Sequence, residues 1–272
     1  MTDLDQSSLD DIDTSKPHPA RMYDFYLQGK DYYEADEIAG NKVLEVFPTI
    51  KTTARVNRSF MHRATRYLAS EAGIRQFLDI GTGIPTRPNL HQVAQEAAAD
   101  SRVVYADYDP VVLRHAEALM RSTPEGRTTY IQADARQPES IMDSAELHET
   151  IDLKQPVGLS LNALLHFVPD ENKPYEIVRY LLDQLAPGSY LAISHCTADF
   201  APEMWAGVAE VYHRGGIPLQ LRSRDEVAAF FEGLDMVAPG LVTPHNWHPD
   251  GNTVPGTSDE SVSMYAALAR KA

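Results

Sequence analysis

The 272-residue sequence contains a single cysteine, Cys196. One cysteine cannot form an internal disulfide, and its isolation excludes a metal site built from several cysteines. The sequence also lacks an apolar run long enough to span a bilayer. Its first residues are acidic and polar, with no basic segment before an apolar stretch, so we expect no signal peptide. These absences together predict a soluble cytoplasmic protein.

Basic residues are scarce as well, because 24 lysines and arginines stand against 39 acidic residues and leave a net charge of −15. Proteins bind nucleic-acid backbones through Lys and Arg, so this balance argues against DNA, RNA and anionic membranes as partners. Hydrophobic residues make up 43% of the chain, which is enough for a substantial core. We therefore expect one large domain, or one domain with an elaborate cap.

The most informative stretch is the glycine-rich turn Gly81-Thr82-Gly83. Residues 75–80 predict a short buried strand before it, and the two glycines allow positive φ and let a ligand approach bare backbone. Asn89, with Gln92 three residues later, resembles a capping box and predicts the start of a helix. A strand, a glycine-rich turn and a helix in this order form the context of a candidate cofactor loop.

This turn lacks the features of phosphate-binding loops. A dinucleotide fingerprint has a third glycine three residues after the second, and this chain has Thr86 there. No Gly-Lys-Ser or Gly-Lys-Thr follows, so the sequence shows no pyrophosphate cradle. Asp79, two positions before the first glycine, would repel a phosphate and suits a ligand with positive charge, such as an ammonium or a sulfonium.

Composition divides the chain into three parts. Residues 1–16 are rich in Asp, Ser and Thr and poor in large apolar side chains, so we expect them to be disordered. Residues 17–72 predict a helical cap of three helices, at about 20–27, 34–46 and 52–72. Residues 73–272 alternate between strands and helices, which predicts a doubly wound parallel α/β sheet with helices on both faces. We expect cap and sheet to form one compact unit.

The expected elements of the third part follow from local pattern. The expected strands span residues 75–80, 102–106, 128–133, 157–161 and 189–194. The expected helices span residues 89–99, 110–121, 137–144, 171–185, 203–212 and 223–231. Two further strands, at about 236–241 and 261–269, have no helix between them and should therefore pair antiparallel.

Polar residues stand at four expected strand ends, where open parallel sheets bind ligands. Asp107 can accept hydrogen bonds from both ribose hydroxyls of an adenosine, and Tyr108 offers a flat face to its adenine. Asp134 can accept from the adenine amino group, and Ala135 can donate its backbone N–H to a ring nitrogen. Asn162 can present its carbonyl oxygen to a ligand ammonium.

Each of these residues also has a structural alternative, since Asp and Asn at strand ends usually cap turns or helices, and Tyr108 could be ordinary packing. The functional interpretation depends on the agreement of four strand ends in order and spacing. The complete expected cofactor set is Asp79, Gly81, Thr82, Gly83, Asp107, Tyr108, Asp134, Ala135 and Asn162.

These motifs resemble those of the class I S-adenosylmethionine-dependent methyltransferases. Residues 79–83 are similar to the first motif of that family, residues 103–107 to the second, residues 131–135 to the third, and residues 159–169 to the segment after the fourth strand. Pro85 departs from the pattern, because the first motif usually has a glycine there.

A closer resemblance is to an actinobacterial group of S-adenosyl methyltransferase-like proteins of undefined substrate. Residues 19–24, 29–31 and 81–86 carry it, and it covers nearly the whole chain after Lys16. The resemblance implies a Rossmann-like sheet of seven strands with the last strand antiparallel, and S-adenosylmethionine as the cofactor. It also implies methyl transfer to a small-molecule acceptor by direct displacement.

Other functions stay open at this point. Amino-methylases of nucleic-acid bases resemble one another in an Asn/Asp-Pro-Pro-aromatic run after the fourth strand, which residues 162–165 lack. A sensor or structural module would bind S-adenosylmethionine or its demethylated product without transfer. A nucleotide-binding oxidoreductase is a third hypothesis, against which the missing third glycine counts. The oligomeric state is open, with a homodimer as one alternative.

His166 is the side chain near the expected site whose ordinary pKa suits a general base. The favoured alternative is a structural histidine before the turn that follows it, because pKa alone does not establish geometry. Arg21, Tyr23 and Tyr26 stand on one short cap helix and are expected to bind the acceptor, although the tyrosines could equally pack the cap onto the sheet. We expect no metal, since the His245 to His248 run lacks a third ligand.

Overall fold

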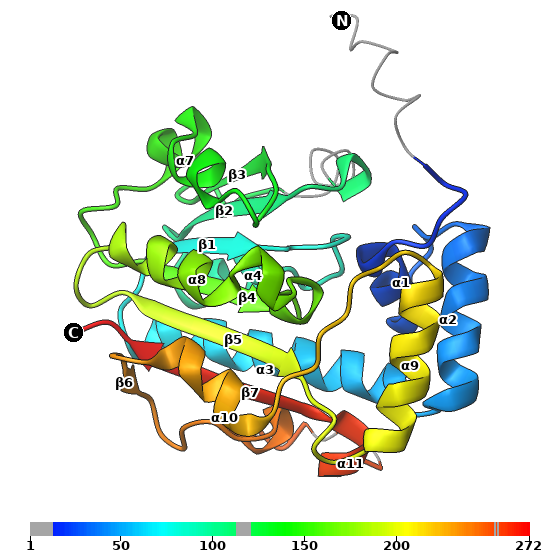
Figure 1. Cartoon of the computed structure of the whole chain (residues 1–272). Coiled ribbons are helices and arrows are strands. Elements are labelled where there is room, and N and C mark those ends of the chain that lie inside the picture. Colours follow the sequence, from blue (N-terminus) through cyan, green and yellow to red (C-terminus); the bar gives the residue numbers. More distant parts are fainter. Residues whose placement is uncertain (1–12, 113–120, 253, 255) are drawn as a thin grey trace, which may run out of the picture.

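The computed structural model describes residues 13–112, 121–252, 254 and 256–272. Within these residues one sheet of seven strands runs through the protein in the order β3-β2-β1-β4-β5-β7-β6 (Figure 1). The strands are β1 (Gln76–Ile80), β2 (Arg102–Asp107), β3 (Arg127–Gln132), β4 (Gly158–Asn162), β5 (Tyr190–Cys196), β6 (Asp235–Met236) and β7 (Met264–Arg270).

The first five strands are parallel, whereas β7 is antiparallel to β5 and β6 is antiparallel to β7. The predicted seven-stranded sheet with an antiparallel tail is therefore confirmed. In Figure 1 the arrowheads of β1 and β5 point toward the end of the sheet where α1, α2 and α9 stand. The carboxyl ends of the parallel strands thus face the cap.

Helices precede the sheet and connect its strands. The cap helices are α1 (Pro19–Tyr26), α2 (Glu34–Val46) and α3 (Ile50–Ser70). The helices among the strands are α4 (Leu90–Ala97), α6 (Pro138–Met142), α7 (Ala145–Thr150), α8 (Pro174–Asp183), α9 (Pro202–Arg214), α10 (Arg224–Ala228) and α11 (Asp259–Val262). Four 3-10 turns complete the described elements: η2 (Leu165–Phe167), η3 (Asp170–Asn172), η4 (Ala229–Phe231) and η5 (Pro244–Asn246).

Successive residues of the central strands point to opposite faces of the sheet, as the two-residue period of a strand requires. Phe77 and Val103 belong to a cluster with α3 and α4 on one face. Their chain neighbours Leu78 and Val104 belong to a cluster with α6 and α8 on the other face. Both faces are covered, which explains why these strands read as nearly continuous apolar runs.

A third apolar cluster joins the cap to the rest of the molecule. It gathers side chains of α1, α2, the first half of α3 and α9. Phe47 is fully buried there, and its ring meets Trp205 of α9 edge-on at a centroid distance of 5.3 Å. The second half of α3 packs on the sheet through Phe60 and Leu68. One continuous helix therefore contributes to both cores.

Several predicted boundaries differ from the structure for identifiable reasons. The strand expected over 236–241 shortens to β6, because Pro239 cannot donate to a ladder. The helix expected over 171–185 begins only at Pro174, since Lys173 adopts a left-handed φ of 54°. The short helices α7 and α11 were not predicted.

Two predictions fall wholly or partly on residues that the structure does not describe. These are most of the helix expected over 110–121 and the first twelve residues of the segment expected to be disordered. Over the described parts of the chain, no helix combines the length and apolar character needed to cross a membrane.

We expect cap and sheet to unfold together, and Phe47 tests this. Phe47→Ala should lower the free energy of unfolding by about 3–5 kcal/mol, because it empties a buried aromatic position. Urea unfolding of a Trp205→Phe background, followed by Trp247 fluorescence, would report on the sheet side, where Trp247 packs against Phe60. Ile38→Ala is the control, since Ile38 is 50% exposed. An unchanged Trp247 midpoint in the Phe47→Ala variant would show that cap and sheet unfold separately.

Candidate functional site

The strand register brings the predicted polar residues to one edge of the sheet. Asp79 of β1 lies beside Ser160 of β4 on one side and Tyr105 of β2 on the other. The chain turns immediately beyond β1, and the Gly81 N–H donates to the carbonyl oxygen of Ala106 at 2.8 Å. The ends of three neighbouring strands therefore meet at the glycine-rich turn.

Glycine stands at these two positions of the turn for different physical reasons. Both adopt positive φ, 74° at Gly81 and 66° at Gly83. A Cβ at Gly81 would lie 2.6 Å from Leu164 Cδ1, so packing as well as backbone geometry excludes a side chain there. A Cβ at Gly83 would meet only the Ala20 Cβ, at 3.8 Å. The turn is thus bare at Gly83, where a ligand can approach the backbone.

Asp107 is tied to this turn by its carboxylate. The Gly83 N–H donates to Asp107 Oδ2 at 2.8 Å, and the Asp109 N–H donates to Oδ1 at 3.0 Å. Burial raises the pKa of Asp107 to about 6, although these N–H groups favour the charged form. Each carboxylate oxygen keeps a second lone pair, so Asp107 can still accept from a pair of ligand hydroxyls.

Asp79 is the second carboxylate at this edge of the sheet, and it is half-buried. The Thr82 hydroxyl lies 3.0 Å from the Asp79 carbonyl oxygen and 3.3 Å from its Oδ2. Burial raises the pKa of Asp79 to about 6, against hydrogen bonding from Ser160 and the positive charge of Arg58, which lower it. Among the residues that the structure describes, no basic side chain forms an ion pair with Asp79 or Asp107. Two such carboxylates at one edge of the sheet, without a cation of their own, favour a ligand that brings positive charge.

Asn162 leaves a hydrogen-bond acceptor unused. Its Nδ2 donates to Ser160 Oγ at 2.6 Å, whereas its Oδ1 is buried and finds no donor within the described part of the chain. Buried polar atoms are nearly always paired, so this oxygen calls for an explanation. Ser160 also hydrogen-bonds the Asp79 side chain. Asp79 and Asn162 therefore present acceptor oxygens around one shared serine.

The backbone just beyond Asn162 is also unusual. Ala163 has a φ of 52°, which is rare for a residue with a side chain and is found preferentially at functional sites. Its N–H donates to the Ser194 carbonyl oxygen at 3.0 Å and fixes the turn to β5.

Tyr108 and His18 meet at the end of β2. Tyr108 is 51% exposed, and its hydroxyl lies 2.5 Å from His18 Nε2. The ring centroids are 5.1 Å apart, and His18 Nδ1 lies 3.1 Å from Asp109 Oδ2. His18 precedes α1, so the cap reaches the position predicted for the adenine. No motif in the sequence indicated this contact.

The residues predicted beside the adenine amino group lie at the end of β3. Asp134 accepts from Arg136 Nη2 at 2.5 Å and from Nε at 2.9 and 3.0 Å. Burial opposes the charged form, but the Arg136 hydrogen bonds prevail and hold the pKa of Asp134 below its ordinary value. Ala135 is half-buried against the core. Their contact with adenine stays a prediction.

His166 lies in a buried polar network. It is 4% exposed, its Nε2 lies 3.7 Å from Cys196 Sγ, and its ring centroid lies 5.3 Å from that of His195. Burial, with the charge of Arg222, holds the pKa of His166 well below its ordinary value. Arg222 binds the Leu165 and Val168 carbonyl oxygens at 2.9 and 3.1 Å. These contacts fit the structural alternative, and a role as base stays a prediction.

The three predicted acceptor residues are buried in the cap or half-buried there. Arg21 Nε lies 3.2 Å from Asp36 Oδ2. The Tyr23 hydroxyl donates to the Ala54 carbonyl oxygen at 3.0 Å, and burial raises the pKa of Tyr23 to about 12. The Tyr26 and Tyr212 hydroxyls are 3.5 Å apart. In this arrangement all three side chains support the cap, and acceptor binding by them stays a prediction.

Arg58 is a residue at this site that the sequence did not indicate. It lies on α3, and its Nη2 donates to the carbonyl oxygens of Thr86 and, at 2.8 Å, Pro88. His62, one turn later on the same helix, places Nε2 2.9 Å from the Pro88 oxygen. The cap thus holds the segment that follows the glycine-rich turn.

The described residues contain no cluster of three or more His, Cys, Asp or Glu placed to hold a metal ion. His245 Nε2 lies 3.4 Å from Asp259 Oδ1, and His248 Nε2 lies 2.7 Å from the Ala238 carbonyl oxygen. These two histidines therefore contact different partners.

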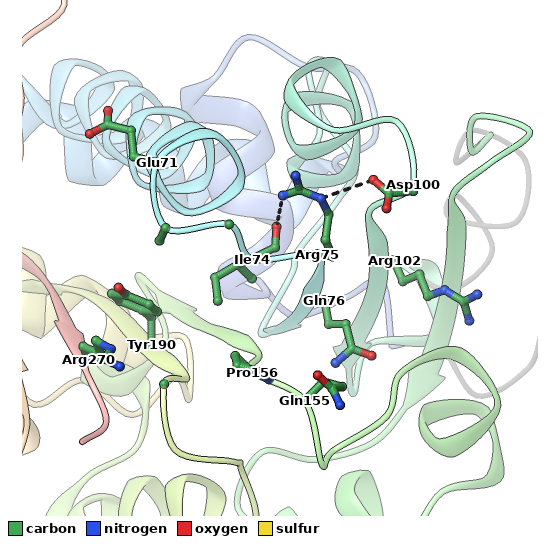
Figure 2. Close-up of a pocket in the computed structure, with 13 residues that line it drawn as sticks. Glu71, Ile74, Arg75, Gln76, Asp100, Arg102, Gln155, Pro156, Tyr190 and Arg270 are labelled. Atoms are coloured by element: carbon green, nitrogen blue, oxygen red, sulfur yellow. Dashed lines mark hydrogen bonds and ion pairs between the residues drawn. The ribbon is translucent and has the colours of Figure 1, made fainter.

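A hollow of about 730 Å³ opens at the opposite edge of the sheet, at the amino ends of the strands (Figure 2). Arg75, Arg102 and Arg270 line it, and Arg75 Nε lies 3.3 Å from Asp100. Arg75 also donates to the Ala69 carbonyl oxygen at the end of α3 at 2.8 Å. The hollow shares no residue with the strand ends described above.

Comparisons with known proteins agree with this geometry. A family model described as S-adenosyl methyltransferase matches residues 5–272. A DUF574 family protein from Streptomyces avermitilis is 52% identical, with a TM-score of 0.94 over 96% of this chain and 99% of that chain. A candidate methyltransferase from Thermobifida fusca is 36% identical, with a TM-score of 0.87 over 95% of this chain and 96% of that chain.

More distant structures share the fold. The plantazolicin methyltransferase BamL, in complex with a triazolic desmethylPZN analogue and S-adenosylhomocysteine, is 12% identical, with a TM-score of 0.52 over 93% of this chain and 95% of that chain. A search of the curated proteins gives no significant match.

The raised pKa of Asp79 makes a prediction about stability. The folded value is about 6 and the ordinary value 3.8, so Asp79 contributes most to stability below about pH 4 and this contribution is lost as the pH rises toward 6. Asp79→Asn should therefore raise the free energy of unfolding at neutral pH by about 1–3 kcal/mol. Urea unfolding across this pH range measures the effect.

Asp134→Asn is the matched control. The pKa of Asp134 lies below its ordinary value, so the substitution should change the free energy of unfolding in the opposite direction. At neutral pH this variant should have a lower free energy of unfolding than the parent. The difference between the two proteins should disappear in acid, where Asp134 of the parent is protonated. An Asp79→Asn variant that is less stable than the parent at neutral pH would contradict the account.

Proposed function

This chain belongs to the S-adenosyl methyltransferase family, and we propose that it transfers the methyl group of S-adenosylmethionine to a small-molecule acceptor by direct displacement. Its cofactor is S-adenosylmethionine. A net charge of −15 is poorly suited to binding nucleic acid, which supports a small molecule as the acceptor. The observation that carries the proposal is the set of acceptor oxygens with lone pairs to spare at the ends of β1, β2 and β4, of which Asn162 Oδ1 has no donor among the described residues.

The amino-acid end of the cofactor is assigned to β1 and β4. Asn162 Oδ1 is buried without a donor among the described residues, and Asp79 lies across Ser160 from it. An ammonium group supplies three donors and a positive charge. It would satisfy the orphaned oxygen and compensate the charge of the half-buried Asp79 carboxylate, so the residues present fit this ligand.

The ribose is assigned to Asp107. Its two carboxylate oxygens are fixed by the Gly83 and Asp109 N–H groups, so the side chain is already oriented before a ligand binds. Charge-assisted hydrogen bonds from two hydroxyls are strong and specific when the acceptor is preorganised. The bare backbone at Gly83 leaves room for the nucleoside beside this carboxylate.

The adenine is assigned to Tyr108, Asp134 and Ala135. The exposed Tyr108 ring offers a flat surface, with His18 on it in this structure. Asp134 would accept from the adenine amino group only if Arg136 shares its oxygens, since both of them contact Arg136. The adenine is therefore the part of the ligand for which the protein offers the fewest free hydrogen-bonding groups.

The chemistry supplied by the bound cofactor is an electrophilic methyl group on a sulfonium. The task of the protein is to hold the acceptor nucleophile in line with it, and proximity and orientation can contribute up to about 7–11 kcal/mol. A general base is optional for such a reaction. The buried, neutral His166 lies with its Nε2 3.7 Å from Cys196 Sγ. We therefore assign catalysis to orientation, with the acceptor losing its proton to solvent.

The proposed cofactor predicts a selective thermal shift. S-adenosylmethionine at about 100 times its Kd should stabilise the fold by about 2.7 kcal/mol, whereas NAD should not raise the melting temperature. Incubation with a panel of small-molecule acceptors should then release S-adenosylhomocysteine above the background of the protein alone. A shift with NAD only would reject the methyltransferase proposal. A shift with S-adenosylmethionine and no transfer to any acceptor would favour the sensor.

Asp107→Ala tests the ribose assignment. The variant should bind S-adenosylhomocysteine about 5- to 150-fold more weakly by calorimetry, as expected when a buried hydrogen-bonding partner is removed. Asp109→Ala is the neighbouring control. Asp109 accepts from the Val111 N–H at 2.9 Å at the start of a helix, so this variant should lose stability but retain affinity. The reverse pattern would mean that Asp109 is the ribose ligand.

A further inference from the structure

Arg58 stands out because it belongs to the cap but contacts the cofactor loop. Its Nη2 holds the Thr86 and Pro88 carbonyl oxygens, and His62 holds the Pro88 oxygen a second time. Two side chains one turn apart on α3 therefore fix the segment after the glycine-rich turn. Only one of them carries a permanent charge.

The guanidinium of Arg58 retains capacity for a ligand. Only its Nη2 bonds to the protein, and no carboxylate of the described residues lies within the 4.0 Å of an ion pair. Arg58 is half-buried. Its positive charge acts on Asp79 at the end of β1.

The amino-acid end of S-adenosylmethionine carries two opposite charges. The ammonium is matched by Asp79 and the orphaned Asn162 Oδ1. The carboxylate needs a cation on the same side of the site, since the carboxylates of Asp79 and Asp107 would otherwise repel it. Arginine suits this role, because its planar fork binds carboxylates with directed hydrogen bonds.

We propose that Arg58 is the specificity-determining residue that binds the α-carboxylate of the cofactor's amino-acid moiety through the N–H groups not used for Thr86 and Pro88. This inference rests on the proposed cofactor site. It assigns a ligand contact to the cap, so that α3 would recognise the cofactor directly as well as supporting its loop.

Calorimetry with two matched ligands tests this assignment. S-adenosylhomocysteine and its decarboxylated analogue, S-adenosyl-3-thiopropylamine, differ only in the carboxylate. The wild-type protein should bind S-adenosylhomocysteine about 10- to 100-fold more tightly than the analogue, as expected for a charge-assisted contact. Arg58→Gln should reduce this preference to less than about 3-fold, mainly by weakening S-adenosylhomocysteine.

Two control variants separate recognition from loop support. His62→Ala removes the second contact to Pro88. Arg55→Gln removes a charge from the same helix, at a position where Nη2 donates to Gln28 Oε1 at 2.7 Å. Both variants should keep the wild-type ratio of the two affinities, even if His62→Ala weakens both ligands. Arg58→Lys, which keeps the charge and loses the fork, should give an intermediate ratio and serves if Arg58→Gln does not fold.

The outcomes distinguish this inference from the proposed function. A wild-type protein that binds both ligands equally, or an Arg58→Gln variant that weakens both by the same factor, would overturn the role of Arg58 and leave the cofactor site standing. A wild-type protein that binds neither ligand would overturn both.

Discussion

The proposed cofactor site depends on two carboxylates without a cation bound to them, one of them buried and the other half-buried. Asp79 and Asp107 lie at the ends of adjacent parallel strands, and burial raises the pKa of each to about 6. Within the described chain, backbone N–H groups and hydroxyls are their hydrogen-bond partners. The fold therefore keeps a site that is costly when empty and favourable when a positively charged ligand occupies it, a common trade of stability for function.

The rest of the structure holds these carboxylates in place. Gly81 and Gly83 are required because the chain must turn with positive φ and direct an N–H to Asp107. The cap closes on the same edge, since α3 belongs to both apolar cores and its Arg58 holds the loop beyond the turn. His18 adds a contact at Tyr108. The cap and the cofactor loop are therefore held together by direct contacts, although they come from separate segments of the sequence.

The sequence predicted what depends on local pattern. The helix over 34–46 matches α2, the capping box at Asn89 forms as expected, and the alternation of strands and helices gives the parallel strands that it predicts. The gathering of Asp79 and Asp107 was also predictable, because parallel neighbours end at one edge.

Contacts between distant segments were not predictable from local pattern. Arg58 reads as an ordinary polar residue of a helix and His18 as one of the residues before the first helix, and nothing local shows that His166 is enclosed by Cys196 and His195.

The most direct test of the central claim is a crystal structure of the protein with S-adenosylhomocysteine. The account predicts the nucleoside at the carboxyl ends of the strands, with both ribose hydroxyls hydrogen-bonded to Asp107 and the ammonium beside Asp79 and Asn162. A ligand bound in the hollow at the opposite edge, between Arg102 and Arg270 (Figure 2), or one that leaves Asp107 without contact, would contradict it.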